Sequence, residues 1–208
     1  MVNYKSAIVK CGPSLLEELR EEQTDFLKNI LNSPKKIERI FKASEHNFGC
    51  AAFHKKCDNK SDTLVLVRTE FSRTIGGYTH YPWDQRNSYL SDANMRTFLF
   101  SLDLKEKYIP IDESNLIHGY SGYGPTFGDG HDLYLADSCN SNTSSYTNFP
   151  HRYNRAGENG IINNQESYTN FAGATNGKNF RVLEYEVFQV LYQWLCSHWF
   201  ILSFFIKY

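Results

Sequence analysis

The densest group of potential metal ligands in the sequence is Cys50, His54 and Cys57. On a helix, Cys50 and His54 would share a face and Cys57 would follow one turn later. A structural zinc site needs four ligands, usually as two close pairs, and the other Cys and His residues stand singly. We therefore predict no metal site here, and a half-buried helical face that carries small thiols.

Two cysteines are candidates for redox chemistry, Cys57 and Cys139. A reactive thiol needs nearby cations that lower its pKa, and Cys57 has Lys55, Lys56 and Lys60 close in sequence. The chain has five cysteines, and its N-terminus lacks an apolar segment long enough for a secretory signal. A reducing compartment with free thiols is the simpler interpretation. A thiol-based redox enzyme or scavenger therefore stays open as one possible function.

No other arrangement commits the sequence to a catalytic mechanism. The glycine-dense segment Gly119–Gly130 lacks the context of a dinucleotide fingerprint and the lysine of a Walker loop, which favours a tight structural turn. His131 and Asp132 are adjacent, so on a strand they would point to opposite faces and could not form a dyad. Glu184 and Glu186 share one face of a strand. We predict a solvated face there, with a partner-binding edge as the alternative.

Length and composition limit the possible classes of protein. The chain has 208 residues, a formal net charge of -1, 41% hydrophobic residues and 22% charged residues. This fits one folded domain with short extensions and excludes a disordered chain. The near-neutral charge provides no basic field, so we expect no binding to nucleic acid. The 15 Phe, 14 Tyr and 3 Trp favour β-structure over a helical bundle, because aromatic side chains fit pleated, half-buried surfaces.

The first part of the chain is predicted to be helical. Ser14 is a good N-cap and Glu17 stands in capping-box position, so a helix is expected from about residue 14 until Asn32-Ser33-Pro34 stops it. Residues 36–42 are interpreted as a second short helical segment. A third helix is expected over about residues 48–57, which includes the cysteines and histidine discussed above.

After residue 60 the pattern changes to strands. Two adjacent glycines, Gly76 and Gly77, indicate a bulge or the close approach of another chain segment. The long polar segment 138–179 is predicted to carry function or to pack through its own aromatic residues. Helices gathered at the N-terminal end and strands separated by turns predict an α+β fold with a largely antiparallel pair of sheets. The predicted strands are residues 62–70, 74–79, 97–102, 115–120, 133–136 and 180–190.

The C-terminal tail differs in character from the rest. Residues 188–206 contain no Asp, Glu, Lys or Arg, a length that could span a bilayer. Polar residues interrupt this segment, however, and its first three residues belong to the last predicted strand. Three interpretations stay open: a membrane anchor, a buried or partner-facing helix, and a tail that is not native to the domain. Membrane contact is thus possible through residues 191–208.

A series of segments in a fixed order resembles the TLDc domain of the oxidation-resistance protein family. The resemblance covers residues 37–190. The elements Gly76-Gly77-Tyr78-Thr79, Gly124-Pro125-Thr126-Phe127-Gly128 and Glu184-Tyr185-Glu186-Val187-Phe188 are specific when taken together. One departure is Ser61-Asp62, where the family usually has Gly-Pro, which should loosen that turn. The full series is Phe53–Lys60, Thr63–Val67, Ile75–Thr79, Phe98–Leu102, Gly124–Leu133, Ser145–Phe149 and Glu184–Val190.

The resemblance implies a eukaryotic domain with a central antiparallel β-sandwich flanked by short helices. It divides the chain into an N-terminal helical extension (1–36), a TLDc domain (37–190) and a hydrophobic tail (191–208). It implies no established catalytic residues and no cofactor. The motif positions are expected to serve mainly the fold, and they are Gly76, Gly77, Tyr78, Thr79, Gly124, Pro125, Thr126, Phe127, Gly128, Gly130 and Asp132.

Family members are linked to protection from oxidative stress, and several bind the vacuolar proton-pumping ATPase. The expectation is therefore a non-catalytic interaction domain with a protein partner, such as a subunit of that ATPase, in the cytoplasm or at the surface of vacuolar or lysosomal membranes. Glu184 and Glu186 are the candidate partner-binding residues. The alternatives are the redox enzyme that uses Cys57 or Cys139, and a form attached to the membrane by the tail.

Overall fold

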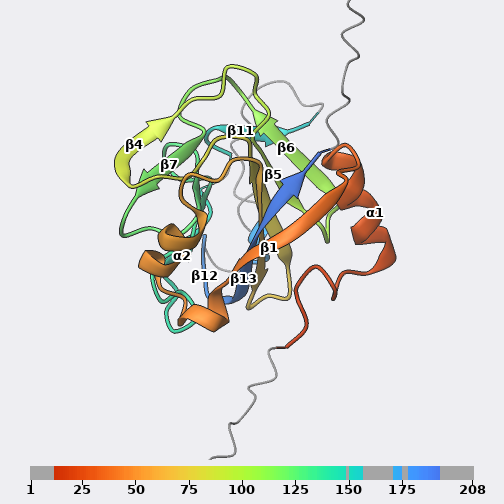
Figure 1. Ribbon diagram of the computed structural model, residues 1–208, viewed down its shortest axis with the longest axis horizontal. Helices are drawn as coiled ribbons and strands as arrows, with labels where there is room; N and C mark the ends of the chain where they lie inside the picture. The colour runs from red at the N-terminus through yellow and green to blue at the C-terminus, as the bar shows by residue number, and fades with distance from the viewer. Residues whose placement is uncertain (1–11, 149, 157–170, 175–177, 193–208) are drawn as a thin grey trace, which may run out of the picture.

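The computed structural model describes residues 12–148, 150–156, 171–174 and 178–192. In this part of the chain, two antiparallel β-sheets pack face to face. Helix α1 (Glu21–Ile30) covers the outer face of the larger sheet, and the shorter helix α2 (Cys50–Cys57) lies against the side of the sandwich (Figure 1). The predicted α+β sandwich with short helices is confirmed.

The larger sheet places the last strand of the domain between the first two. Its order is β1 (Lys36–Lys42), β13 (Val182–Leu191), β2 (Thr63–Thr69), β3 (Thr74–Thr79), β5 (Phe98–Ser101), β6 (Glu106–Pro110) and β11 (Tyr153–Arg155). The smaller sheet has the order β12 (Asn179–Phe180), β10 (Ser145–Tyr146), β9 (Leu133–Tyr134), β8 (Thr126–Phe127), β7 (Ile117–Tyr120) and β4 (Arg86–Leu90). The strand pairings within both sheets are antiparallel.

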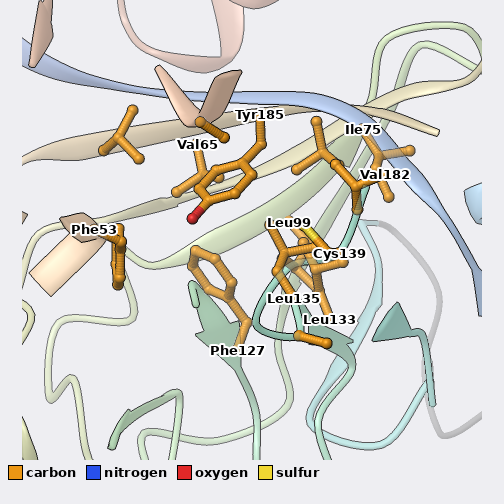
Figure 2. Packing of buried hydrophobic residues seen from close by; sticks show 14 of the residues in the cluster. Phe53, Val65, Ile75, Leu99, Phe127, Leu133, Leu135, Cys139, Val182 and Tyr185 are labelled. Atoms are coloured by element: carbon orange, nitrogen blue, oxygen red, sulfur yellow. The ribbon is translucent and has the colours of Figure 1, made fainter. Parts of the chain in front are cut away.

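Strand β2 shows why the core has two parts. Val65 and Val67 point into the space between the sheets, whereas Leu64 and Leu66 point to the outer face, under α1. A strand that is buried on both faces has a continuous apolar sequence, as β2 does. Figure 2 shows the core between the sheets, where Val65 and Tyr185 of the larger sheet face Phe127 of the smaller one.

The two adjacent glycines of β3 serve the two core layers separately. A Cβ atom on Gly77 would lie 2.5 Å from Phe127 Cζ, across the space between the sheets. A Cβ atom on Gly76 would lie 2.0 Å from the carbonyl oxygen of Val65 and 2.6 Å from Phe100 Cζ, on the outer face. The predicted close approach of another chain segment is confirmed for both residues, because each glycine leaves room for a phenylalanine ring.

The first helix begins later than predicted. Ser14 and Glu17 do interact, since the Ser14 backbone N–H donates to Glu17 Oε2 at 2.9 Å, but they close only a single turn over residues 15–18. Helix α1 itself begins after Arg20, and Gln23 completes the capping interaction there. The 3-10 turn η1 (Ala43–His46) and helix α2 follow strand β1 and precede β2. The third predicted helix is confirmed as α2.

The prediction of a helix over residues 36–42 was wrong, because this segment is strand β1. It pairs along β13, with Ile37 opposite Val190 and Arg39 opposite Phe188. The single predicted strand 180–190 is also divided at Arg181 into β12 and β13, which belong to different sheets. Strands β4, β6, β8, β10 and β11 were not predicted. These segments are short or polar, so they form strands only because they pair with neighbouring strands in the sheets.

Most of the predicted tail, residues 193–208, lies outside the described residues, as do Cys11 and Cys196. Among the helices that the structure describes, none has the length and apolar character needed to cross a membrane.

Candidate functional site

The candidate thiols Cys57 and Cys139 are fully buried between the sheets. Burial raises the pKa of Cys139 to about 12. Burial also raises the pKa of Cys57, and the nearby Lys60 and Lys56 only partly offset this effect. A reactive thiol needs the opposite, a lowered pKa and access to solvent. The surroundings of both thiols are therefore those of core residues.

His54 links α2 to the end of β7 and the loop that follows it. Its Nδ1 lies 2.8 Å from Asp58 Oδ1, and its Nε2 lies 2.9 Å from the carbonyl oxygen of Tyr120 and 3.0 Å from that of Tyr123. Both ring nitrogens thus face oxygen atoms of the protein. Among the described residues, no group of three His, Cys, Asp or Glu side chains could hold a metal ion. Here His54 acts as a structural link.

A group of tyrosines and histidines gathers on the outer face of the smaller sheet. We name it the tyrosine–histidine surface. Inward and outward positions alternate along its strands: Ile117 and Leu133 point into the core, whereas their neighbours His118 and Tyr134 point outward. The surface comprises Tyr89, His118, Tyr120, Tyr123, His131, Tyr134 and Tyr146.

Four of these rings form a nearly parallel row across the strands. The ring centroids of Tyr89 and His118 are 4.3 Å apart, those of His118 and His131 are 5.6 Å apart, and those of His131 and Tyr134 are 5.5 Å apart. Tyr123 stands edge-on to the last three rings of the row. Such edge-to-face and offset contacts stabilise aromatic pairs. The surface is therefore a preformed arrangement of rings.

The two histidines of the tyrosine–histidine surface are neutral at neutral pH. Burial, aided by the neighbouring His118, lowers the pKa of His131 to about 4, and burial also lowers the pKa of His118. Burial raises the pKa of Tyr134 to about 12. His131 Nδ1 and the Tyr146 hydroxyl are hydrogen-bonded at 2.7 Å. The surface therefore combines aromatic area with neutral hydrogen-bonding groups.

Comparison with known proteins decides the family. A family model described as the TLDc domain matches residues 14–191. This chain belongs to the TLDc domain family. A search of curated proteins found no match to it. The matched part of the TLDc domain includes α1, which the sequence prediction assigned to an extension over residues 1–36.

The TLDc motif positions lie at turns and in the core. Gly128 has φ +80°, and a Cβ atom there would lie 2.0 Å from Asp132 Oδ2. Asp132 is fully buried and accepts hydrogen bonds from the backbone N–H groups of His151 and Arg152, at 2.5 and 2.9 Å. The others lie in or beside strands β3 and β8, and they are Gly76, Gly77, Tyr78, Thr79, Gly124, Pro125, Thr126, Phe127 and Gly130.

The expectation that Glu184 and Glu186 form a solvated or partner-binding pair needs correction. Glu186 is 0% exposed and accepts hydrogen bonds from Ser14 Oγ at 2.5 Å and from the Leu15 backbone N–H at 3.0 Å. Lys42 Nζ lies 3.3 Å from the same carboxylate. The N-terminal segment covers this face of β13, which the strand pattern could not show. Glu184 is only partly buried, and its carboxylate accepts from the Ser44 backbone N–H.

Sequence reasoning missed the tyrosine–histidine surface, although a signal was present. Hydrophobic and tyrosine or histidine residues alternate at Ile117-His118 and Leu133-Tyr134, which is the period of a half-buried strand. However, β9 and β10 have only two residues each. Their order in the sheet places these side chains together, and that order depends on long-range pairing.

The tyrosine–histidine surface should make the stability of this TLDc domain depend on pH. The pKa of His131 is lowered from 6.5 to about 4, so between these values the unfolded chain binds a proton that the folded chain does not. The contribution of neutral His131 to the free energy of unfolding should be fully present above pH 6.5 and should be lost as the pH falls towards 4. Between these two pH values, the free energy of unfolding of wild type should fall by about 1–2 kcal/mol more than that of His131→Asn. Urea unfolding at both pH values measures this difference. Asparagine suits the positive φ at this position. If the free energies of unfolding of the two proteins differ by the same amount at both pH values, the prediction is wrong.

Proposed function

We propose that this protein is a non-catalytic TLDc interaction domain that binds the vacuolar proton-pumping ATPase and supports resistance to oxidative stress. Membership of the TLDc family supports the partner and the process. The observation that supports binding is the tyrosine–histidine surface, which the fold presents on its outer face. The domain would act in the cytoplasm, at the surface of vacuolar or lysosomal membranes.

The composition of the tyrosine–histidine surface is that of a protein interface. Tyrosine is enriched at interface hot spots, because it contributes a large, rigid contact area together with a hydroxyl group. Tyr89 and Tyr120 are 40% and 37% exposed, so a partner can cover them without rearrangement of the fold. At its rim, Lys178 Nζ lies 5.0 Å from the centroid of the Tyr146 ring. A partner that carries an acidic side chain beside an apolar patch would match this surface.

The proposal is tested by co-sedimentation of the purified full-length chain with ATPase-bearing vacuolar membranes from its own source organism. The double variant Tyr89→Ser/Tyr120→Ser should bind at least about 10-fold more weakly, because loss of a hot-spot tyrosine costs about 2 kcal/mol. The control is Leu183→Ser, since Leu183 is 53% exposed and lies on β13 in the other sheet. Its binding should not change.

Two results would count against the proposal. If wild type fails to co-sediment with these membranes, the ATPase is not the partner. If the tyrosine double variant binds as well as wild type, the partner uses another face of the domain. Circular dichroism and thermal unfolding of each variant show whether the fold is intact, which separates loss of contact from loss of structure.

A further inference from the structure

A groove of about 500 Å³ lies on the outer face of the larger sheet, beside the end of α1. Tyr78 of β3 and Phe98 of β5 both line it, with ring centroids 5.2 Å apart and an interplanar angle of 24°. Met95 and Ile109 also line it and are 51% and 41% exposed. This volume is typical of sites for small molecules. The groove is separate from the tyrosine–histidine surface, which belongs to the other sheet.

Two cations, Arg96 and Lys107, line this groove. Arg96 is exposed, whereas Lys107 is only partly exposed, and its Nζ lies 4.1 Å from the centroid of the Phe98 ring. In the part of the chain that the structure describes, neither side chain forms an ion pair with a carboxylate. Burial lowers the pKa of Lys107. A partly buried cation of this kind would be stabilised by an anion in the groove.

The only carboxylate that lines the groove, among the described residues, is already engaged. Asp62 Oδ1 accepts a hydrogen bond from the Tyr78 hydroxyl at 2.6 Å and lies 2.7 Å from His80 Nδ1. These contacts fix the side chain of Asp62, in the turn Ser61-Asp62 that the family resemblance predicts to be loosened. Among the described residues, Asp62 forms no ion pair with Arg96 or Lys107, because its carboxylate is engaged by Tyr78 and His80.

We propose that this groove binds a small organic carboxylate with a flat apolar body. The carboxylate would meet Arg96 and Lys107, and the apolar body would lie against Phe98, Met95 and Ile109. Charge complementarity and the size of the groove together support this class of ligand. The inference does not depend on the proposed partner, because it concerns a different face and a different kind of ligand.

The experiment is a titration of the full-length chain with 2-naphthoate, followed by amide chemical shifts in nuclear magnetic resonance spectra. Binding with a Kd of about 1 mM is expected, since a ligand of this size gains about 0.3 kcal/mol per heavy atom. Lys107→Met should weaken binding about 5- to 10-fold, whereas Lys107→Arg should retain it. Lys56→Met, on the exposed face of α2, removes an equal charge elsewhere and should have no effect.

Four results would overturn the proposal. It is wrong if 2-naphthoate shifts no groove amides at about ten times the expected Kd. It is wrong about the charge if neutral 2-naphthylmethanol binds as tightly, or if Lys107→Met binds 2-naphthoate like wild type. It is wrong about the apolar body if inorganic phosphate or acetate binds as tightly as 2-naphthoate. If Lys107→Met fails to fold, Arg96→Gln provides the same comparison.

Discussion

Replacement of Gly76 by alanine is expected to destabilise the domain by about 3 kcal/mol or more. The added methyl group would lie 2.0 Å from the carbonyl oxygen of Val65. This oxygen is backbone in the neighbouring strand β2, at the centre of the larger sheet, so it cannot move without disturbing the pairing of β2 with β3. The measurement is the free energy of unfolding from urea denaturation.

Two further glycines provide comparisons for this prediction. At Gly77 the obstacle is the ring of Phe127 rather than backbone, and a ring can tilt, so Gly77→Ala should cost less, about 1–3 kcal/mol. At Gly12 no atom lies within 4 Å of the added methyl group, so Gly12→Ala should change stability by less than about 0.5 kcal/mol. A Gly76→Ala variant as stable as Gly12→Ala would contradict the packing described for β3.

Replacement of Glu186 by glutamine is expected to cost about 3–5 kcal/mol, the usual penalty for removing one partner of a buried ion pair. Glu186 is fully buried, and it is bound by Lys42 Nζ at 3.3 Å and Arg39 at 3.1 Å. Lys42 is itself 4% exposed and also donates to the carbonyl oxygen of Pro13 at 2.9 Å. The variant removes the nearer of the two carboxylates beside this buried ammonium group and leaves only Glu184, whose Oε2 lies 4.0 Å from Lys42 Nζ. Urea denaturation measures the loss.

The same variant should loosen the N-terminal segment. Glu186 accepts from the Ser14 hydroxyl and the Leu15 backbone N–H, and Leu15 covers the outer core layer. Hydrogen exchange at Leu15 should therefore become faster than the global loss of stability explains. Glu38→Gln removes an exposed carboxylate that pairs with Lys36, and it should cost less than about 1 kcal/mol.

A double variant tests whether the buried pair acts as a unit. Lys42→Met with Glu186→Met should be less destabilised than the sum of the two single changes, because neither charge is then left alone. Strict additivity of the two effects would show that the carboxylate and the ammonium group do not depend on each other.

The sequence predicted those elements whose pattern is local. Strand β3 was predicted at residues 74–79. Strand β2 was predicted to within a residue at each end, because β-branched and apolar residues run almost continuously along it. The helix prediction for β1 was wrong because a segment of seven residues is too short for its hydrophobic pattern to separate a helix from a strand. Its partner β13 lies more than a hundred residues further along the chain, and only that pairing makes it a strand.

The same limit applies to the functional residues. The pattern of β13 placed Glu184 and Glu186 on one face, but burial of Glu186 depends on Ser14, which is 172 residues away in sequence. The tyrosine–histidine surface likewise depends on the order of strands β4, β7 and β9 in the smaller sheet. Each distant contact comes from packing between segments, which no local periodicity records.

The position of β13 between β1 and β2 has a consequence for how the chain is made. Until about residue 180 has emerged from the ribosome, β1 and β2 each lack β13, the strand that pairs with both of them. Their unpaired edges are exposed to other chains throughout this time. Folding that depends on such distant pairing is slow. We therefore expect the nascent domain to need a chaperone until its last strand is released, and chains that end before residue 182 to aggregate.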